Sequence, residues 1–226
     1  MQQKTSPKVI FFDVNETLLD LAPVKASITQ ALEGKSELVS QWFTSLLHYS
    51  LVLSAAQQFE TFDTIGTHVL MLLAESNGIS LSYQEAKTAT APLLALPAHA
   101  EVPEALELLK AHNYRLVALT NSSQRGMSEQ LSSAKIAHYF EHQLSVEQIK
   151  TYKPHTTVYH WASEQMNILP TESLMVAAHG WDIAGALWAG WRAAFVQRPG
   201  KALFPLAPQP EIIAPNVLEV AQKLIR

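Results

Sequence analysis

The sequence predicts an α/β protein: a doubly wound parallel sheet with a Rossmann-like core and an inserted helical cap subdomain. Short apolar segments alternate with helical segments from residue 98 to the end of the chain, which is typical of a parallel sheet covered by helices. Residues 18–97 instead show helical spacing and few strand signals. We therefore expect a core formed by residues 1–17 and 98–226, with residues 18–97 inserted as an all-helical cap.

Four apolar residues, Val9 to Phe12, form the first predicted strand, and the run stops abruptly at Asp13. Such a continuous run is typical of a strand that is buried on both faces. In open α/β sheets, ligands bind beyond the carboxyl ends of the strands, which makes Asp13 a candidate for chemistry. An aspartate at this place can equally cap the next turn, so the residue alone leaves both interpretations open.

The predicted cap has apolar residues at helical spacing, for example Leu38, Trp42, Leu46 and Tyr49. Turn signals at residues 33–35 and 77–78 divide it into several helices. We expect nearly all of its leucine and aromatic side chains to form the core of a helix bundle.

The second part of the chain alternates strongly between helix and strand. Proline at the first turn begins one predicted helix, and Asn216 is the expected N-cap of the last helix. The predicted strands are residues 115–119, 174–178 and 193–196, and the predicted helices are residues 103–112, 127–134, 156–166, a segment ending at 189, and 217–224.

Composition excludes several classes of function. The 226 residues are 48% hydrophobic and 16% charged, as in a globular protein, and the formal net charge is −4. The sequence has no basic run for nucleic acid, no cysteine for a disulfide or thiolate site, and no apolar stretch near the roughly 18 residues of a membrane span. The apolar run near the N-terminus is too short for a signal peptide. We expect a cytoplasmic protein without a membrane or nucleic-acid partner.

Polar residues follow three predicted strands: Asp13, the pair Thr120 and Asn121, and Asp182. Lys153 lies in a loop before a helix. A carboxylate nucleophile needs a cation to keep it ionised, a polar group to orient it, and a second carboxylate to activate water. Each residue also has an ordinary interpretation, as a helix cap or a surface charge, but together they favour a catalytic site.

These segments resemble the four motifs of the haloacid dehalogenase superfamily. Residues 11–20, Phe-Phe-Asp-Val-Asn-Glu-Thr-Leu-Leu-Asp, are similar to the first motif, and residues 119–121, 152–154 and 181–182 are similar to the second, third and fourth. The likeness is greatest to the type II L-2-haloacid dehalogenase branch. There, proline follows the lysine, a tyrosine lies six residues after it, and the fourth motif is Trp-Asp followed by a helix with Gly-Ala.

The resemblance implies a mechanism in which Asp13 attacks the substrate carbon, releases halide and forms an ester. Water, activated with help from Asp182, then hydrolyses that ester and releases a 2-hydroxy acid. Lys153 neutralises Asp13, with support from Tyr159. Thr17 is the fourth catalytic residue and orients the carboxylates. The substrate-binding residues implied are Val14, Asn15, Phe43, Thr120, Asn121 (part of a halide cradle), Tyr159, His179 and Trp181 (an apolar wall).

Two positions argue against a phosphatase of the same superfamily. Superfamily phosphatases carry a second aspartate two residues after the nucleophile and another four residues before the end of the fourth motif. This sequence has Asn15 and Ala178 there, and a hard cation such as Mg²⁺ needs several oxygen ligands. We expect no metal and no cofactor.

The sequence departs from the dehalogenases at the leaving-group pocket. Their cap arginine, next to the tryptophan, corresponds to Phe43, and no arginine occurs before Arg115. Their serine and asparagine in the fourth motif correspond to Ala177 and His179. A histidine here can act as an acid or base, or can simply fill space.

The expected function is hydrolysis of a small 2-halo or other 2-substituted carboxylic acid to a 2-hydroxy acid, with activity weakened by Phe43. The alternatives are a Mg²⁺-dependent phosphatase and a catalytically silent binding protein. The resemblance also implies a homodimer, and Leu46, Leu47, Leu51 and Leu53 form an apolar stripe that suits either a dimer contact or core packing.

Overall fold

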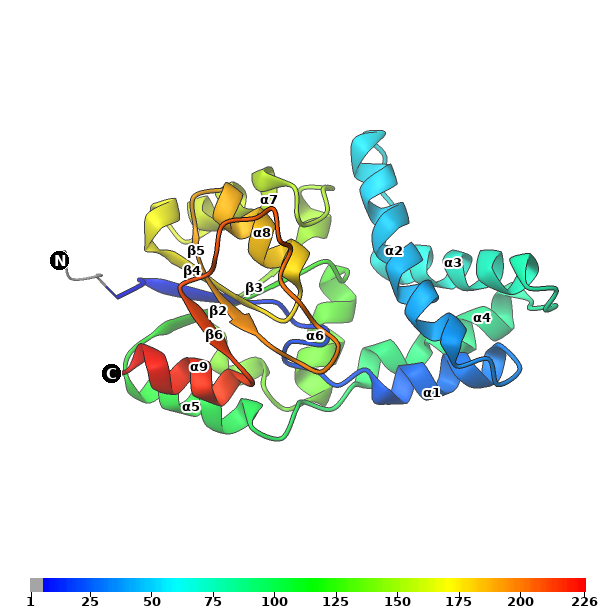
Figure 1. Ribbon diagram of the computed structural model, residues 1–226, viewed down its shortest axis with the longest axis horizontal. Coiled ribbons are helices and arrows are strands. Elements are labelled where there is room, and N and C mark those ends of the chain that lie inside the picture. The colour runs from blue at the N-terminus through cyan, green and yellow to red at the C-terminus, as the bar shows by residue number, and fades with distance from the viewer. Residues whose placement is uncertain (1–5) are drawn as a thin grey trace.

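The computed structural model describes residues 6–226, so the first five residues of the predicted core lie outside the described part. Figure 1 shows the sheet and its helices at one end of the molecule and the cap helices at the other. The strands of the described residues form one parallel sheet in the order β3-β2-β1-β4-β5-β6. The predicted α/β fold is confirmed. The strands are β1 Val9–Phe12, β2 Arg115–Thr120, β3 His142–Ser145, β4 Ser173–Ala177, β5 Arg192–Val196 and β6 Ile212–Ala214.

Strand β1 lies in the middle of the sheet, and all four of its residues are buried. Ile10 pairs with Leu116 of β2 on one side and with Leu174 of β4 on the other. Along the chain, β1 is followed by β2 and β3, which lie on one side of it, and then by β4, which lies on its other side. The strand order therefore reverses between β1 and β4. Ligands of doubly wound sheets bind at the carboxyl ends of the strands beside this point.

Neither edge strand, β3 or β6, was among the predicted strands. Strand β3 begins with the polar residues His142 and Gln143, and β6 has only three residues, of which Ile213 is exposed. Edge strands are short and partly solvated, so neither carries the continuous apolar run that marks β1.

Helices cover both faces of the sheet. Figure 1 shows α7 and α8 over one face and α5 with α9 over the other. Asn216 is the N-cap of α9, as predicted, because its Oδ1 accepts a hydrogen bond of 2.9 Å from the Glu219 amide. The core helices are α5 Val102–Ala111, α6 Gln124–Ser133, α7 Thr156–Gln165, α8 Gly180–Trp188 and α9 Val217–Leu224.

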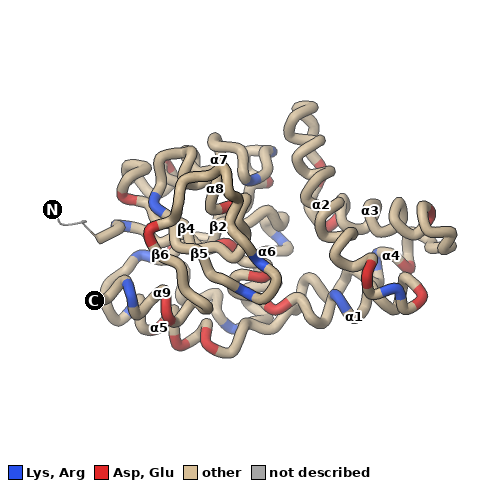
Figure 2. The backbone as a smooth tube through the Cα atoms, in the orientation of Figure 1, with Lys and Arg blue, Asp and Glu red and all other residues tan. Residues whose placement is uncertain are grey.

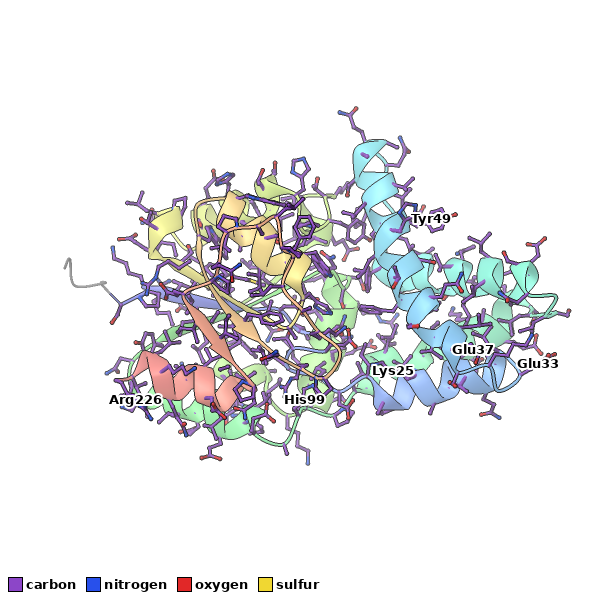
Figure 3. All side chains as sticks on the ribbon, in the orientation of Figure 1. Lys25, Glu33, Glu37, Tyr49, His99 and Arg226 are labelled. Atoms are coloured by element: carbon purple, nitrogen blue, oxygen red, sulfur yellow. The ribbon has the colours of Figure 1, made fainter. Side chains whose placement is uncertain are left out.

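The cap is helical between the two connections to the core. Trp42 of α2 is buried and donates a hydrogen bond of 2.9 Å to the Gly66 carbonyl of α3. Tyr49, predicted as part of the same buried stripe, is 39% exposed, and Figure 3 shows it on the side of α2 that faces away from the core. The cap helices are α1 Ala22–Ala31, α2 Glu37–Ala55, α3 Phe62–Ser76 and α4 Tyr83–Thr90, followed by a 3-10 turn at Ala91–Ala95.

The two connections between cap and core run side by side. The amide of Asp20 donates to the Pro97 carbonyl at 2.8 Å, and the amide of His99 donates to the Leu18 carbonyl at 2.9 Å. The insertion therefore leaves and re-enters the core at one place, next to the end of β1.

The charge and apolar residues of the surface can be compared with the nucleic-acid, membrane and dimer partners considered from the sequence. In Figure 2 basic and acidic residues are interspersed, without a basic stripe. No helix within residues 6–226 is long and apolar enough to cross a membrane. Of the stripe considered for a dimer contact, Leu46 is fully buried in the cap and Leu51 is exposed. The homodimer stays a prediction.

Candidate active site

Asp13 follows β1 directly, and its buried carboxylate contacts the side chains of Lys153, Thr17 and His179. Its Oδ1 accepts a hydrogen bond of 2.9 Å from the Lys153 ammonium. Its Oδ2 accepts one of 2.6 Å from the Thr17 hydroxyl and lies 3.1 Å from His179 Nδ1. The Thr17 hydroxyl in turn accepts from the Ala178 amide at 2.9 Å. Thr17 therefore ties the carboxylate to the end of β4.

Lys153 is a fully buried cation with three acceptors. Its ammonium donates to Asp13 at 2.9 Å, to Asp182 Oδ2 at 2.7 Å and to the Leu119 carbonyl at 2.9 Å. Asn121 holds its main chain from both sides, because Oδ1 accepts from the Lys153 amide at 3.0 Å and Nδ2 donates to the Lys153 carbonyl at 3.4 Å. All three hydrogens of the ammonium are thereby used, which fixes the cation between the two carboxylates.

Asp182 is completely buried in the first turn of α8. Its Oδ2 accepts from Lys153, and its Oδ1 accepts a hydrogen bond of 2.6 Å from the Tyr159 hydroxyl. Gly185 makes this contact possible, since a Cβ there would lie 2.6 Å from both the Tyr159 hydroxyl oxygen and Pro154 Cβ. The Gly-Ala step of the fourth motif thus has a packing reason.

The surroundings shift the two carboxyl groups in opposite directions. Burial raises the pKa of Asp13, but Lys153 and the hydrogen bonds from His179 and Thr17 outweigh it and hold that pKa well below its usual range. Burial raises the pKa of Asp182, and the attraction of Lys153 does not fully offset that effect and the repulsion from Asp13. Asp13 is therefore the more acidic of the two groups, which suits a carboxylate nucleophile.

His179 and Glu16 form a second buried cluster next to Asp13, and only His179 of the two was a predicted site residue. His179 lies with Nδ1 on Asp13 and with Nε2 3.0 Å from Glu16 Oε2. Glu16 also binds two lysines: Lys25 of α1 donates to its Oε1 at 3.0 Å, and Lys201 donates to its Oε2. Figure 3 shows Lys25 at the start of the cap, beside the core.

Glu16 was not among the predicted site residues. It lies in the first motif, between two residues that were assigned roles, and the only local signal for it is a carboxylate directly beyond a buried strand. Its φ of 61° is in the left-handed region, which costs a non-glycine residue roughly 1–2 kcal/mol. Nothing in the sequence indicates that conformation or the distant partner Lys201.

A cavity of about 620 Å³ opens beside this cluster. Phe43 lines it, stacked on the His179 ring at 5.9 Å between centroids, and Trp181 stacks on His179 at 5.1 Å. The Lys201 ammonium lies 5.7 Å from the centre of the Phe43 ring. Lys153 and His179 both line the cavity, and each contacts the Asp13 carboxylate.

Five predicted substrate-binding residues are not among the residues that line this cavity: Val14, Asn15, Thr120, Asn121 and Tyr159. Val14 is fully buried. The Asn15 amide donates to the Ser122 hydroxyl at 3.1 Å and accepts from Gln130 at 3.0 Å. The Thr120 hydroxyl accepts from the Ser122 amide at 3.1 Å. The amide of Asn121, predicted to cradle a halide, is instead bonded to the main chain of Lys153.

The site offers poor conditions for a divalent metal ion. Within residues 6–226 no three histidine, cysteine or acidic side chains are grouped as metal ligands. Lys153 already pairs with both Asp13 and Asp182, and Ala178, directly after β4, contributes only its amide.

The family model described as haloacid dehalogenase-like hydrolase matches residues 10–196. The (S)-2-haloacid dehalogenase of Pseudomonas sp. strain YL is 27% identical over 205 residues, which cover 90% of this chain and 88% of that protein.

Two solved structures share the whole fold. The L-2-haloacid dehalogenase RSc1362 superposes with a TM-score of 0.93 at 24% identity, covering 98% of this chain and 100% of that chain. The L-2-haloacid dehalogenase of Xanthobacter autotrophicus with chloropropionic acid covalently bound gives 0.89 at 19% identity, covering 97% and 98%. The chain belongs to the haloacid dehalogenase-like hydrolase family.

Proposed function

We propose that this protein hydrolyses the carbon–halogen bond of a small 2-halo carboxylic acid through an ester formed on Asp13. The relatives named as (S)-2-haloacid dehalogenases and the likeness in fold support this substrate class. The observation that carries the proposal is the state of Asp13: a buried, ionised carboxylate bonded to Lys153 and His179, which both line a largely apolar cavity.

The geometry suits attack on carbon. A carboxylate in an apolar, water-poor site is a stronger nucleophile than one in water. Phe43, Leu47 and Trp181 supply apolar walls, and the buried Lys153 and Thr17 orient the two oxygens of Asp13. The halide leaves as an anion and needs no proton, so no acid is required beside it.

The phosphatase alternative lacks its acid and part of its metal site. Asn15 stands where the phosphatases carry an acid, and its amide is bonded to Ser122 and Gln130. Ala178 brings no carboxylate. A silent binding protein is disfavoured because burying charged groups costs several kcal/mol each unless they are paired, and Lys153, Asp13 and Asp182 are buried together. A module that only binds a ligand has no need of this arrangement.

Phe43 lines the cavity where the resemblance would place the cap arginine of the dehalogenases. Phe43 brings no charge, so the cations that line the cavity from the core are Lys153, His179 and Lys201. Lys153 is paired with Asp13 and Asp182, and His179 and Lys201 are partly neutralised by Glu16. Ordinary L-2-chloro acids should therefore turn over slowly, bromo acids faster and fluoro acids slowest, because a poorer leaving group depends more on a nearby cation.

The test is a single-turnover reaction with excess enzyme and L-2-bromopropanoate in ¹⁸O water. Label should enter the Asp13 carboxylate first, because water attacks the carbonyl carbon of the ester. Asp13→Asn should release no bromide, and a chelator should leave the wild-type rate unchanged. Direct appearance of label in the hydroxy acid, with Asp13→Asn still active, contradicts the proposal. Activity that vanishes with chelator and returns with Mg²⁺ favours a phosphatase-like metal site.

A further inference from the structure

His179 is held between two carboxylates. Its ring is 5% exposed, with Nδ1 3.1 Å from Asp13 Oδ2 and Nε2 3.0 Å from Glu16 Oε2. A hydrogen bond to each carboxylate needs a hydrogen on each ring nitrogen. Burial lowers the pKa of His179, but the hydrogen bonds to Asp13 and Glu16 outweigh burial and raise it. The resting enzyme therefore holds an imidazolium next to its nucleophile.

Alkylation of Asp13 changes this balance. When Asp13 becomes an ester it loses its negative charge, and the Nδ1 proton of His179 loses its anionic partner. Glu16 still accepts from Nε2–H, so the neutral ring that remains has its lone pair on Nδ1, directed at the ester. A carboxylate that orients a histidine, which in turn faces an acyl group, is the arrangement by which many hydrolases activate a nucleophile.

The other candidate base, Asp182, lacks access to water. Its side chain is completely buried, with one oxygen bonded to Lys153 and the other to Tyr159. The resemblance implied that Asp182 helps to activate water. Its contacts instead fit a role in holding Lys153 and Tyr159.

Glu16 is placed to keep its own charge. Burial raises its pKa, but His179 and Lys201 outweigh this effect and hold the pKa well below its usual range. Lys25 of the cap binds the second oxygen at 3.0 Å. Gly180 lets the segment that carries Lys201 cross the start of α8, because a Cβ at Gly180 would overlap the Ala202 carbonyl oxygen.

We infer that Glu16 and His179 form a dyad that activates water for hydrolysis of the Asp13 ester, with His179 as the base and Glu16 as its positioning residue. This inference rests on the proposed function. When the ester forms, His179 releases its Nδ1 proton to solvent as the halide departs. Neutral His179 then takes a proton from water while the oxygen attacks the carbonyl carbon of Asp13.

The remaining steps restore the resting state. The bond between that carbon and the substrate oxygen breaks, and the leaving alkoxide takes the proton from His179. Asp13, now a carboxylic acid, returns its proton to His179 Nδ1. One water is consumed, and one halide, one proton and one 2-hydroxy acid are released. Lys153, on the Asp13 oxygen, stabilises the negative charge of the tetrahedral intermediate.

The test compares His179→Asn with the wild type in bromide release and in the intact mass of quenched enzyme, again with L-2-bromopropanoate. Removing a general base typically costs about 10²–10⁴ in rate. His179→Asn should therefore release about one bromide per active site in a burst and then stall, with the ester accumulating on Asp13. The burst itself shows that the variant is folded. The matched control is His112→Asn, which changes an exposed histidine at the C-terminal end of α5. It should release bromide at the wild-type rate without accumulating ester.

Glu16→Gln supplies a readout that a merely structural role would not move. The charged groups facing His179 are Asp13, Glu16 and Lys201, and the Phe43 ring of the cap stacks on it. Loss of the Glu16 charge should lower the basicity of His179 in the ester form. The pH profile of ester hydrolysis should then shift its acid limb to lower pH and lose part of its plateau rate.

Each outcome is decisive. Steady turnover by His179→Asn at the wild-type rate, without ester, overturns the dyad but leaves the proposed function intact as long as the wild type forms the Asp13 ester. A Glu16→Gln profile that keeps the wild-type acid limb overturns the role of Glu16. Absence of both bromide and ester in the wild type removes the proposed function, and the dyad with it.

Discussion

Replacement of Lys153 by methionine tests the centre of the site most directly. The change removes a fully buried cation and leaves two buried carboxylates, Asp13 and Asp182, together with the Leu119 carbonyl. Removing one partner of a buried ion pair costs about 3–5 kcal/mol, because the remaining charge is left uncompensated. Total stabilities are roughly 5–15 kcal/mol, so the variant should fold but unfold at clearly lower urea concentration.

The stability lost in the Lys153→Met variant should depend on pH. Without Lys153, burial and mutual repulsion raise the folded-state pKa of the two carboxyl groups above the unfolded value of about 3.9. Groups of this kind contribute stability below the unfolded pKa that is lost as pH rises through the folded pKa. In the wild type the pKa of Asp13 is lowered instead, so its contribution is present above about 3.9 and lost as pH falls. The stability difference between the two proteins should therefore shrink from pH 7 to pH 5.

Urea denaturation at both pH values measures this difference. The matched control is Lys8→Met, which breaks the largely exposed pair of Lys8 with Glu172 and should change stability little at either pH. A deficit below about 1 kcal/mol that is the same at pH 7 and pH 5 would refute the reasoning, since it would mean that Lys153 is solvated or that the carboxylates find other partners.

Two further substitutions test the cavity and the packing behind it. Phe43→Arg should raise chloro-acid turnover, because a cation at a developing anion is typically worth about 10²–10³ in rate; an unchanged rate in the folded variant would mean that the halide leaves elsewhere. Gly185→Ala should destabilise the fold by about 1–3 kcal/mol and slow turnover, because its Cβ would displace Tyr159. Gly66→Ala in α3, where a Cβ meets only ordinary contacts at 3.5 Å, should be neutral or stabilising, and equal losses from both glycine variants would argue against the role of Tyr159.

The parts of the fold that the sequence predicts well are those with strong local patterns. Strand β1 is central and buried on both faces, so it has an unbroken apolar run, whereas β3 and β6 lie at the edges and have none. Tyr49 shows the limit for helices: the spacing of α2 predicts a buried stripe that includes it, but Ser50 is the next buried residue after Leu46 and Tyr49 is left exposed.

The order of the motifs in the sequence was enough to predict that Asp13, Lys153 and Asp182 lie together, because residues beyond the carboxyl ends of parallel strands meet at one edge of the sheet. Only the tertiary structure decided what each group does there. Asn15 and Asn121 lie in the motifs, yet their amides are bonded within the fold. Glu16 and Lys201 are 185 residues apart and meet because the segment after β5 folds back across α8. A local pattern records burial and period, but the partners of a buried charge are fixed by packing between distant segments, which no local pattern contains.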